Sequence, residues 1–189
     1  MPDLFDHVIA HDPGGKSKPR WPAGSIVRAR FSECGLYRYE LSEIWDWRLP
    51  LVMFQMMNPS VASVEYSDPT LRRTGEFARA WGYGGQLIGN MHAYRATDSK
   101  RLLACADPIG PENDEAIRRM AARALIVVLA FGLPPKPLRP RAREVIRMLA
   151  DMGASLKYLR LSKDGTPQHP LYLPGSLPPL EYRPESVSV

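Results

Sequence analysis

The sequence has few cysteines and no long apolar run. Its 189 residues include two cysteines, Cys34 and Cys105, too few for a disulfide framework or a cysteine-based zinc site. The longest apolar stretch, residues 121–133, contains Arg123 and ends before two prolines, so it is too short to span a membrane. Met1 to His11 has no basic-then-apolar signal pattern. We therefore expect a cytoplasmic protein without membrane contact.

The chain also lacks the common motifs of nucleotide-phosphate loops, α/β-hydrolases and metal sites. It has no GxxxxGK[ST], GxGxxG or GxSxG segment. His7 and His11 have the i, i+4 spacing of metal ligands, but no third ligand accompanies them, and His92 and His169 form no metal-binding pair. The sequence therefore predicts no metal site and no cofactor.

The composition is that of a globular protein with a modest excess of positive charge. Hydrophobic residues make up 44% of the chain and charged residues 24%, close to globular averages. The formal net charge of +5 is compatible with a polyanionic partner but does not require one. We expect an extended N-terminal arm over residues 1–24, a single α/β domain over 25–175 and a C-terminal tail over 176–189.

Apolar runs and segments of helical periodicity alternate along the predicted domain. Strands are expected over residues 36–41, 51–57, 86–90, 125–131 and 156–161. Helices are expected over residues 69–81, 99–106, 111–123 and 141–152. Alternation of this kind favours right-handed βαβ crossovers. The predicted fold class is therefore α/β, a three-layer αβα domain with a mostly parallel central sheet.

In such a sheet, ligands bind beyond the carboxyl ends of the strands, where this chain has polar residues. Asn58-Pro59-Ser60 stops the strand 51–57, and the Asn58 amide can position a water molecule or read a base edge. His169 precedes a proline after the last strand, where it can act as an acid or base or stabilise an anion. Each has a structural alternative, Asn58 as a loop cap and His169 as a loop residue without a catalytic partner.

Charged residues flank the same loops. Asp68 is the expected N-cap of the helix that Pro69 opens. Arg72, Arg73 and Lys163 are candidate phosphate ligands, because arginine grips phosphate through two parallel hydrogen bonds and lysine adds charge. The alternative is a solvated, non-binding face, which is common for exposed arginines. DNA or a nucleotide is the candidate partner.

Seven segments form a combination that can be compared with known families. They are Leu36–Tyr39, Met57–Ser60, Asp68–Arg73, Phe77–Gly84, Asn90–Asp98, Asp107–Asp114 and Lys163–Pro174. Together they resemble a bacterial and archaeal domain of unknown function, the family numbered 1643, over roughly Cys34 to Pro174. That resemblance implies membership of a family but no activity.

The order of the motifs carries a second, more distant resemblance. An Asn-Pro turn at Asn58 ends one strand, Asn90 ends the next, Phe131-Gly132 ends an apolar strand, and His169-Pro170 lies in the final loop. This order is similar to that of the uracil-DNA glycosylase superfamily. The resemblance implies a fold of that type, a water molecule positioned by Asn58, a base read by Asn90, and a departing base stabilised by His169.

The same resemblance implies roles for neighbouring residues and also shows departures. Arg95 and Thr97 would help to bind the base, together with Pro59 and Ser60, and Asp68 would assist the water molecule if it is not only a helix cap. Serine is absent after His169-Pro170, where Leu171-Tyr172 stands. No aromatic residue directly follows Ser60 to stack on a flipped base, so Tyr66 or Tyr172 is the candidate for that contact.

Three functions follow as hypotheses. The first is an enzyme that cleaves the N-glycosidic bond of a base in DNA or in a nucleoside. The second is a non-catalytic nucleic-acid or nucleotide-binding module on the same fold. The third is an enzyme acting on an unrelated small molecule, because one fold can host many activities.

Overall fold

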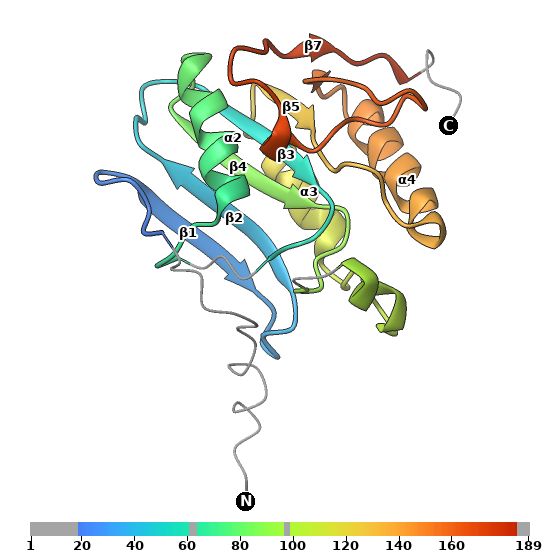
Figure 1. The fold of residues 1–189 in the computed structure, drawn as a ribbon. Coiled ribbons are helices and arrows are strands. Elements are labelled where there is room, and N and C mark those ends of the chain that lie inside the picture. The colour runs from blue at the N-terminus through green and yellow to red at the C-terminus, as the bar shows by residue number, and fades with distance from the viewer. Residues whose placement is uncertain (1–18, 61–63, 97–98, 185–189) are drawn as a thin grey trace, which may run out of the picture.

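The computed structural model describes residues 19–60, 64–96 and 99–184, which form one central sheet with helices around it (Figure 1). The sheet has seven strands: β1 (Ile26–Phe31), β2 (Arg38–Ile44), β3 (Leu51–Met56), β4 (Gly85–Asn90), β5 (Ile126–Leu129), β6 (Leu156–Tyr158) and β7 (Leu180–Glu181). The α-helices are α2 (Pro69–Ala80), α3 (Asn113–Ala121) and α4 (Arg139–Asp151). Short 3-10 helices are η1 (Ser99–Ala104), η2 (Lys136–Leu138) and η3 (Pro170–Tyr172). The α/β fold class is confirmed.

The strand order is β1-β2-β4-β3-β5-β6-β7. The four adjacent strands β4, β3, β5 and β6 run parallel to one another. The pairs β1–β2, β2–β4 and β6–β7 are antiparallel. The sheet is therefore mixed, and the prediction that it is mostly parallel is not confirmed. The reason is that β1 and β2 form a hairpin and β7 returns along β6, and neither β1 nor β7 was expected from the sequence.

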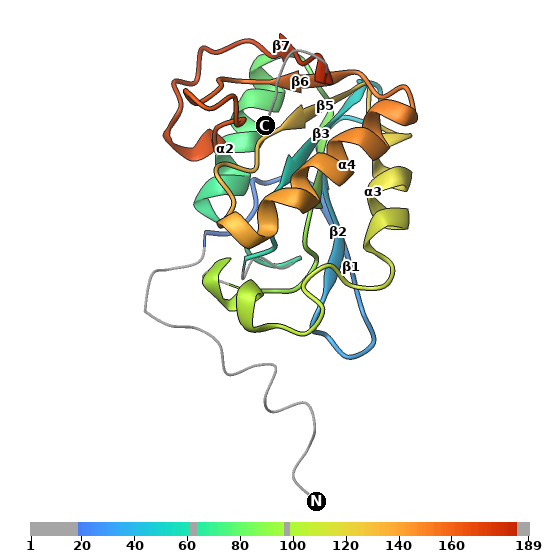
Figure 2. The same ribbon diagram turned by 90° about the vertical axis from the view of Figure 1, so that its right-hand side faces the viewer.

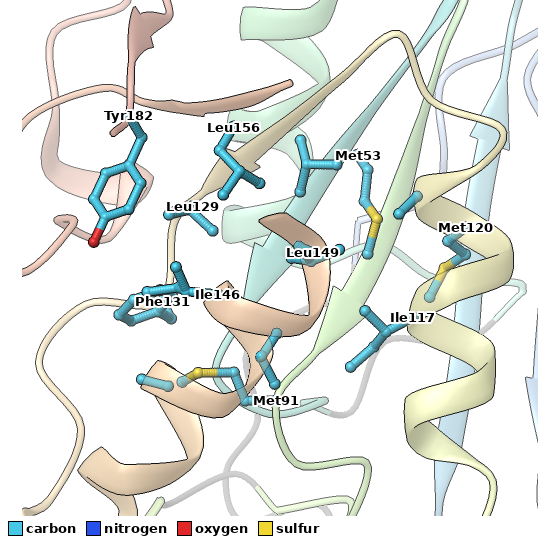
Figure 3. Packing of buried hydrophobic residues seen from close by; sticks show 14 of the residues in the cluster. Met53, Met91, Ile117, Met120, Leu129, Phe131, Ile146, Leu149, Leu156 and Tyr182 are labelled. Atoms are coloured by element: carbon cyan, nitrogen blue, oxygen red, sulfur yellow. The ribbon is translucent and has the colours of Figure 1, made fainter. Parts of the chain in front are cut away.

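The helices lie on opposite faces of the sheet, with α2 on one face and α3 and α4 on the other (Figures 1 and 2). On the α2 face, Phe77 and Trp81 pack against Phe54 of β3. On the other face, Met53 and Leu129 of the sheet meet Leu149 of α4 (Figure 3). Residues that alternate along β3 thus enter different cores, as the two-residue period of a strand requires. No helix in the described part of the chain is long and apolar enough to cross a membrane.

Parts of both predicted terminal segments pack on the domain. Trp21 contacts the core under α2, and the backbone of Arg20 bridges to Tyr66. At the other end, Tyr182 is 7% exposed and packs edge-on against Tyr158. Within the predicted C-terminal tail, β7 pairs with β6 and Tyr182 fills part of the core, while the domain boundaries themselves stay a prediction. Residues 1–18 and 185–189 lie outside the described residues.

Three chain segments meet beyond the carboxyl ends of the parallel strands. After β3 and β4, Met91 N donates to Met56 O and Ala96 N donates to Pro59 O. After β5, Gly132 N donates to Pro167 O, which ties this strand end to the loop that carries His169. These backbone hydrogen bonds hold together the loops that contain the site residues predicted from the sequence.

Candidate functional site

A cavity of about 260 Å³ lies where these strand ends meet the start of α2. Apolar side chains such as Met56, Ile88 and Phe131 form part of its wall. Its polar lining residues are Arg38, Asn58, Ser60, Asp68, Thr70, Asn90 and His169. The structure therefore brings five of the predicted site residues into one cavity.

Asn58 is held in place through its amino group. Nδ2 donates to Ala96 O at 2.7 Å and to Pro59 O at 3.2 Å, so the amide fastens the loop after β3 to the turn after β4. An amide has one donor group and one acceptor oxygen. Because both donor positions face loop carbonyls, the oxygen of Asn58 is the atom left for a molecule in the cavity. Asn58 thus combines the loop-cap role and a cavity-facing role.

The Asp68 carboxylate accepts two hydrogen bonds from the protein and also lines the cavity. Its Oδ1 accepts a hydrogen bond of 2.8 Å from Leu71 N, which makes it the N-cap of α2, as predicted. Its Oδ2 accepts a hydrogen bond from the Ser60 hydroxyl. Among the lining residues that the structure describes, Asp68 is the sole carboxylate. It is therefore the available proton acceptor in the cavity.

Asn90 ends β4 with its side chain buried, 2% exposed. Its amide nitrogen has no hydrogen-bond partner within the described residues. The backbone at Asn90 is held in place, because Asn113 Nδ2 donates to Asn90 O and to Met91 O, each at 3.0 Å. A buried donor without a partner costs about 1–3 kcal/mol. The backbone of Asn90 is thus held in place, and its amide nitrogen is a buried donor in a residue that lines the cavity.

His169 lines the cavity, and one of its ring nitrogens has a defined partner. Its Nδ1 accepts a hydrogen bond of 3.3 Å from Leu171 N, so the neutral ring carries its proton on Nε2. Burial lowers the pKa of His169 below its ordinary value of 6.5, an effect that the charge of Asp68 partly opposes. At neutral pH the ring is therefore uncharged and offers an Nε2–H donor.

Arg38 lines the cavity and was not among the candidates from sequence. Its side chain is 2% exposed at the start of β2. Burial lowers the pKa of Arg38 to about 10. The charge of Arg95 acts in the same direction, and the charge of Asp68 opposes it. The guanidinium remains charged at neutral pH. The sequence signal was weak, because arginine in a strand of alternating polarity usually faces solvent.

Several predicted ligands lie outside the cavity lining. The Arg95 guanidinium donates to Gly35 O at 3.0 Å and lies over the Phe31 ring, 5.1 Å from its centre, so it braces the β1–β2 hairpin. The Pro59 carbonyl accepts hydrogen bonds from Asn58 Nδ2 and from Ala96 N, and Pro59 does not line the cavity. Thr97 lies outside the described residues.

The predicted phosphate ligands are dispersed. Arg73 pairs with Glu76 at 2.9 Å and donates to the carbonyl of Leu173, so it fastens the segment after η3 to α2. Arg72 is exposed on α2, and Lys163 is exposed in the turn after β6. Neither belongs to the cavity lining. Tyr172, 87% exposed in η3, stands three residues from His169 without lining the cavity.

The cavity can hold a polar planar group and supply both donors and acceptors. Its donors are the guanidinium of Arg38, the amide of Asn90 and the Nε2–H of His169, and its acceptors are Asn58 and Asp68. Among the described residues, no group of three or more His, Cys, Asp or Glu could hold a metal ion. The chemistry that these residues support is acid–base and electrostatic.

Comparison with protein families identifies the chain's relatives. The family described as Protein of unknown function (DUF1643) matches residues 38–171. The chain belongs to this family. No curated protein and no solved structure was found to match it.

The DUF1643 match coincides with the candidate site. It begins at Arg38, the first residue of the cavity lining, and ends two residues after His169, the last. Strands β1 and β7, which complete the sheet at its two edges, lie outside the match. The region shared with the family is thus the part of the chain that builds the cavity.

Proposed function

We propose that this DUF1643 protein cleaves the N-glycosidic bond of a base, in DNA or in a nucleoside. The observation that carries the proposal is the meeting of Asn58, Asn90 and His169 in one cavity, in the chain order that the glycosylase-like motifs assign to them. The finer fold assignment, a uracil-DNA glycosylase-like domain, is part of the same proposal. It is supported by that motif order and by helices on both faces of the sheet.

The size of the cavity suits one base. About 260 Å³ lies slightly below the range of roughly 300–1,000 Å³ typical of pockets for drug-sized ligands. A duplex base reaches such a pocket only when the nucleotide is flipped out of the stack, which costs a few kcal/mol. On this proposal, backbone contacts from a surface with net positive charge offset that cost.

In the proposed reaction, water attacks the sugar carbon that bears the base. The Asn58 oxygen orients the water molecule, and Asp68 accepts its proton through a lone pair not used by Ser60 or Leu71. The bond from C1′ to the base nitrogen breaks and its electron pair stays on the base, while the water oxygen forms the new bond to C1′. The base leaves as an anion that His169 stabilises through Nε2–H. The base then takes up the proton that Asp68 accepted, which leaves a free base, a sugar hydroxyl and the Asp68 carboxylate.

One observation favours the second candidate, a nucleic-acid or nucleotide-binding module without chemistry. Asn58 is an amide that cannot accept a proton, and both oxygens of Asp68 already accept hydrogen bonds from the protein. Such a module would bind nucleic acid with steep salt dependence and form no product. Its affinity would depend on surface arginines such as Arg72 more than on His169.

Base release from a panel of oligonucleotides and nucleosides with damaged or modified bases tests the proposal. Chromatography of the free base gives the readout, with Asn58→Ala and His169→Ala as the diagnostic variants. The matched control is Glu115→Ala, an exposed residue of α3 outside the cavity lining. We expect release from at least one substrate, lost in both variants and kept in the control. Release that is unchanged in both variants would contradict the mechanism.

A further inference from the structure

A second cavity, of about 290 Å³, contains none of the residues assigned to the proposed reaction. Its lining comes from the segment after β5, from α4, from the turn after β6 and from Tyr182. We propose that this cavity binds a nucleotide, with the base against its apolar wall and the phosphate on Arg139 and Arg143. The inference rests on the proposed function, which makes a nucleic-acid component the class of ligand, and it adds a second binding site.

The two cavities have a wall in common. Phe131 lines both of them. Gly132 N donates to Pro167 O at 3.0 Å, and Pro167 lines the second cavity, whereas His169, two residues further on, lines the first. The chain is closely packed at this point, because a Cβ at Gly132 would lie 3.3 Å from the Cβ of His169. The two cavities are therefore immediate neighbours.

The second cavity has an apolar wall that suits a planar ring. Phe131, Ile146 and Tyr182 line it and belong to the hydrophobic cluster of Figure 3. Leu133 also lines it and is 54% exposed, so part of this wall faces solvent. The volume of about 290 Å³ is close to the 260 Å³ of the first cavity, which suits one base. A base that covers this wall removes apolar surface from water, which favours binding.

Two arginines of α4 give the second cavity its positive charge. Arg139 and Arg143 are one helical turn apart, so they lie on the same face of α4, and both line the cavity. Arg139 Nε donates to Pro134 O at 3.2 Å, and Pro134 is itself a lining residue, so the guanidinium of Arg139 is held at the cavity wall. Arginine keeps its charge and binds phosphate through paired N–H groups.

Asp164 is the one carboxylate among the lining residues that the structure describes. Its Oδ1 accepts a hydrogen bond of 3.1 Å from Thr166 N, so it stabilises the turn after β6. Two arginines and one carboxylate give the lining a formal charge of +1. The positive charge favours an anionic group, and the apolar wall favours a ring. A nucleotide carries both.

Calorimetry with the four deoxynucleosides and their 5′-monophosphates tests the second site without any need for turnover. For at least one base, we expect the monophosphate to bind at least about tenfold more tightly than the nucleoside, as a charged hydrogen bond provides. Arg143→Gln should abolish this gain. Arg147→Gln, which removes an exposed arginine of the same helix outside this lining, should keep it. A gain that is equal in the two variants, or absent in the wild-type protein, would overturn the phosphate contact.

Leu133→Ala locates the ring, because Leu133 lines the second cavity and not the first. The truncation should weaken the binding of nucleoside and monophosphate alike, by about threefold or more, since both lose apolar contact. An unchanged affinity would place the ring elsewhere and overturn the proposal. Inorganic phosphate should bind much more weakly than the monophosphate, and equal affinities would mean that the ring is not recognised.

An oligothymidylate distinguishes the two sources of the nucleotide. If Arg143→Gln weakens the binding of the oligothymidylate as well as that of the monophosphate, the second cavity receives part of a nucleic-acid strand. If Arg143→Gln weakens the binding of the monophosphate alone, the cavity receives a free nucleotide.

The outcomes separate this inference from the proposed function. Monophosphate binding that depends on Arg143, without any base release, would retain the second site and reject the glycosylase. Base release, together with monophosphate binding that does not depend on Arg143, would retain the enzyme and reject the second site.

Discussion

The Ser60 hydroxyl donates a hydrogen bond to the carboxylate of Asp68, and this bond joins the loop after β3 to the first turn of α2. The other oxygen of the same carboxylate caps the helix through Leu71 N. The Asp68 side chain thus caps helix α2 and also lines the cavity. A substitution that keeps the cap but removes the carboxylate separates these two roles.

Asp68→Asn is that substitution. Asparagine caps a helix about as well as aspartate, but it cannot accept the proton of the water molecule. We expect base release to fall by about 100-fold or more, the usual contribution of a general base. Asp68→Ala should lose the same activity and also have a free energy of unfolding about 1 kcal/mol lower than Asp68→Asn. Near-normal release by Asp68→Asn would remove Asp68 from the mechanism.

The protonation state of His169 gives a prediction that needs no substrate. Burial lowers the pKa of His169 below 6.5, and the hydrogen bond from Leu171 N to Nδ1 places the proton of the neutral ring on Nε2. Long-range nitrogen NMR spectra should show this tautomer, with a titration midpoint below 6.5. A midpoint above 6.5 would mean that the ring is charged near neutral pH, contrary to the proposed role.

His92 should make the protein less stable in acid. Its side chain is 1% exposed, and burial lowers its pKa to about 4. Between pH 6.5 and 4 the unfolded chain therefore binds more protons than the folded chain, so the free energy of unfolding falls as the pH falls. The full effect is about 3 kcal/mol.

Denaturant unfolding at several pH values checks the role of His92. His92→Leu should flatten the dependence by up to about one proton across this window. Met91→Leu, a neighbouring core substitution without a titratable group, should leave the slope unchanged. Equal slopes in wild type and His92→Leu would show that another group is responsible.

Asn113 should affect stability and base binding indirectly, because its side chain holds the backbone at the end of β4. Its amide donates to Asn90 O and Met91 O, so Asn113→Ala leaves two buried carbonyls without this donor. We expect a loss of about 2–4 kcal/mol in the free energy of unfolding, measured by chemical denaturation, and weaker base binding by calorimetry. Glu115→Ala, an exposed change on the same helix, is the control. A stability loss equal to that of the control would contradict this role.

Tyr172 is the exposed aromatic residue nearest in sequence to His169, and it can stack on a base next to the one that enters the cavity. Stacking contributes about 1–3 kcal/mol per base, so Tyr172→Ala should weaken binding to single-stranded DNA by roughly 5- to 150-fold. Binding of a free base should not change. Trp47→Ala, an exposed aromatic residue in the connection before β3, should bind DNA normally. Fluorescence anisotropy gives both affinities.

Much of the fold could be predicted because local signals were strong. The Asp68-Pro69 pair marked the start of α2, and the buried apolar run before Asn58 became β3. Strands β1 and β7 were missed for different reasons. Strand β1 alternates arginine with small apolar residues and has no two-residue turn signal, and β7 is too short for any periodicity. The pairing of β7 with β6, Lys157 opposite Glu181, also joins segments that are distant in sequence.

The candidate site was predicted in part. Asn58 lies just after β3, Asn90 ends β4 and His169 lies in the loop after β6, so the topology of parallel strands brings them to one place. Arg38 was not predicted as a site residue, because its burial depends on how β2 lies beside the loops after β4. Arg73 was predicted as a phosphate ligand, yet it pairs with Glu76 and a distant carbonyl, contacts that sequence spacing does not reveal.

The most direct test of the central claim is mass spectrometry of the modified oligonucleotide panel after incubation with excess protein. We expect at least one oligonucleotide to lose the mass of its base and gain that of water, and Asn58→Ala and His169→Ala to leave the same oligonucleotide intact. Oligonucleotides that all remain intact while binding with steep salt dependence would contradict cleavage of the N-glycosidic bond and favour a non-catalytic binding module.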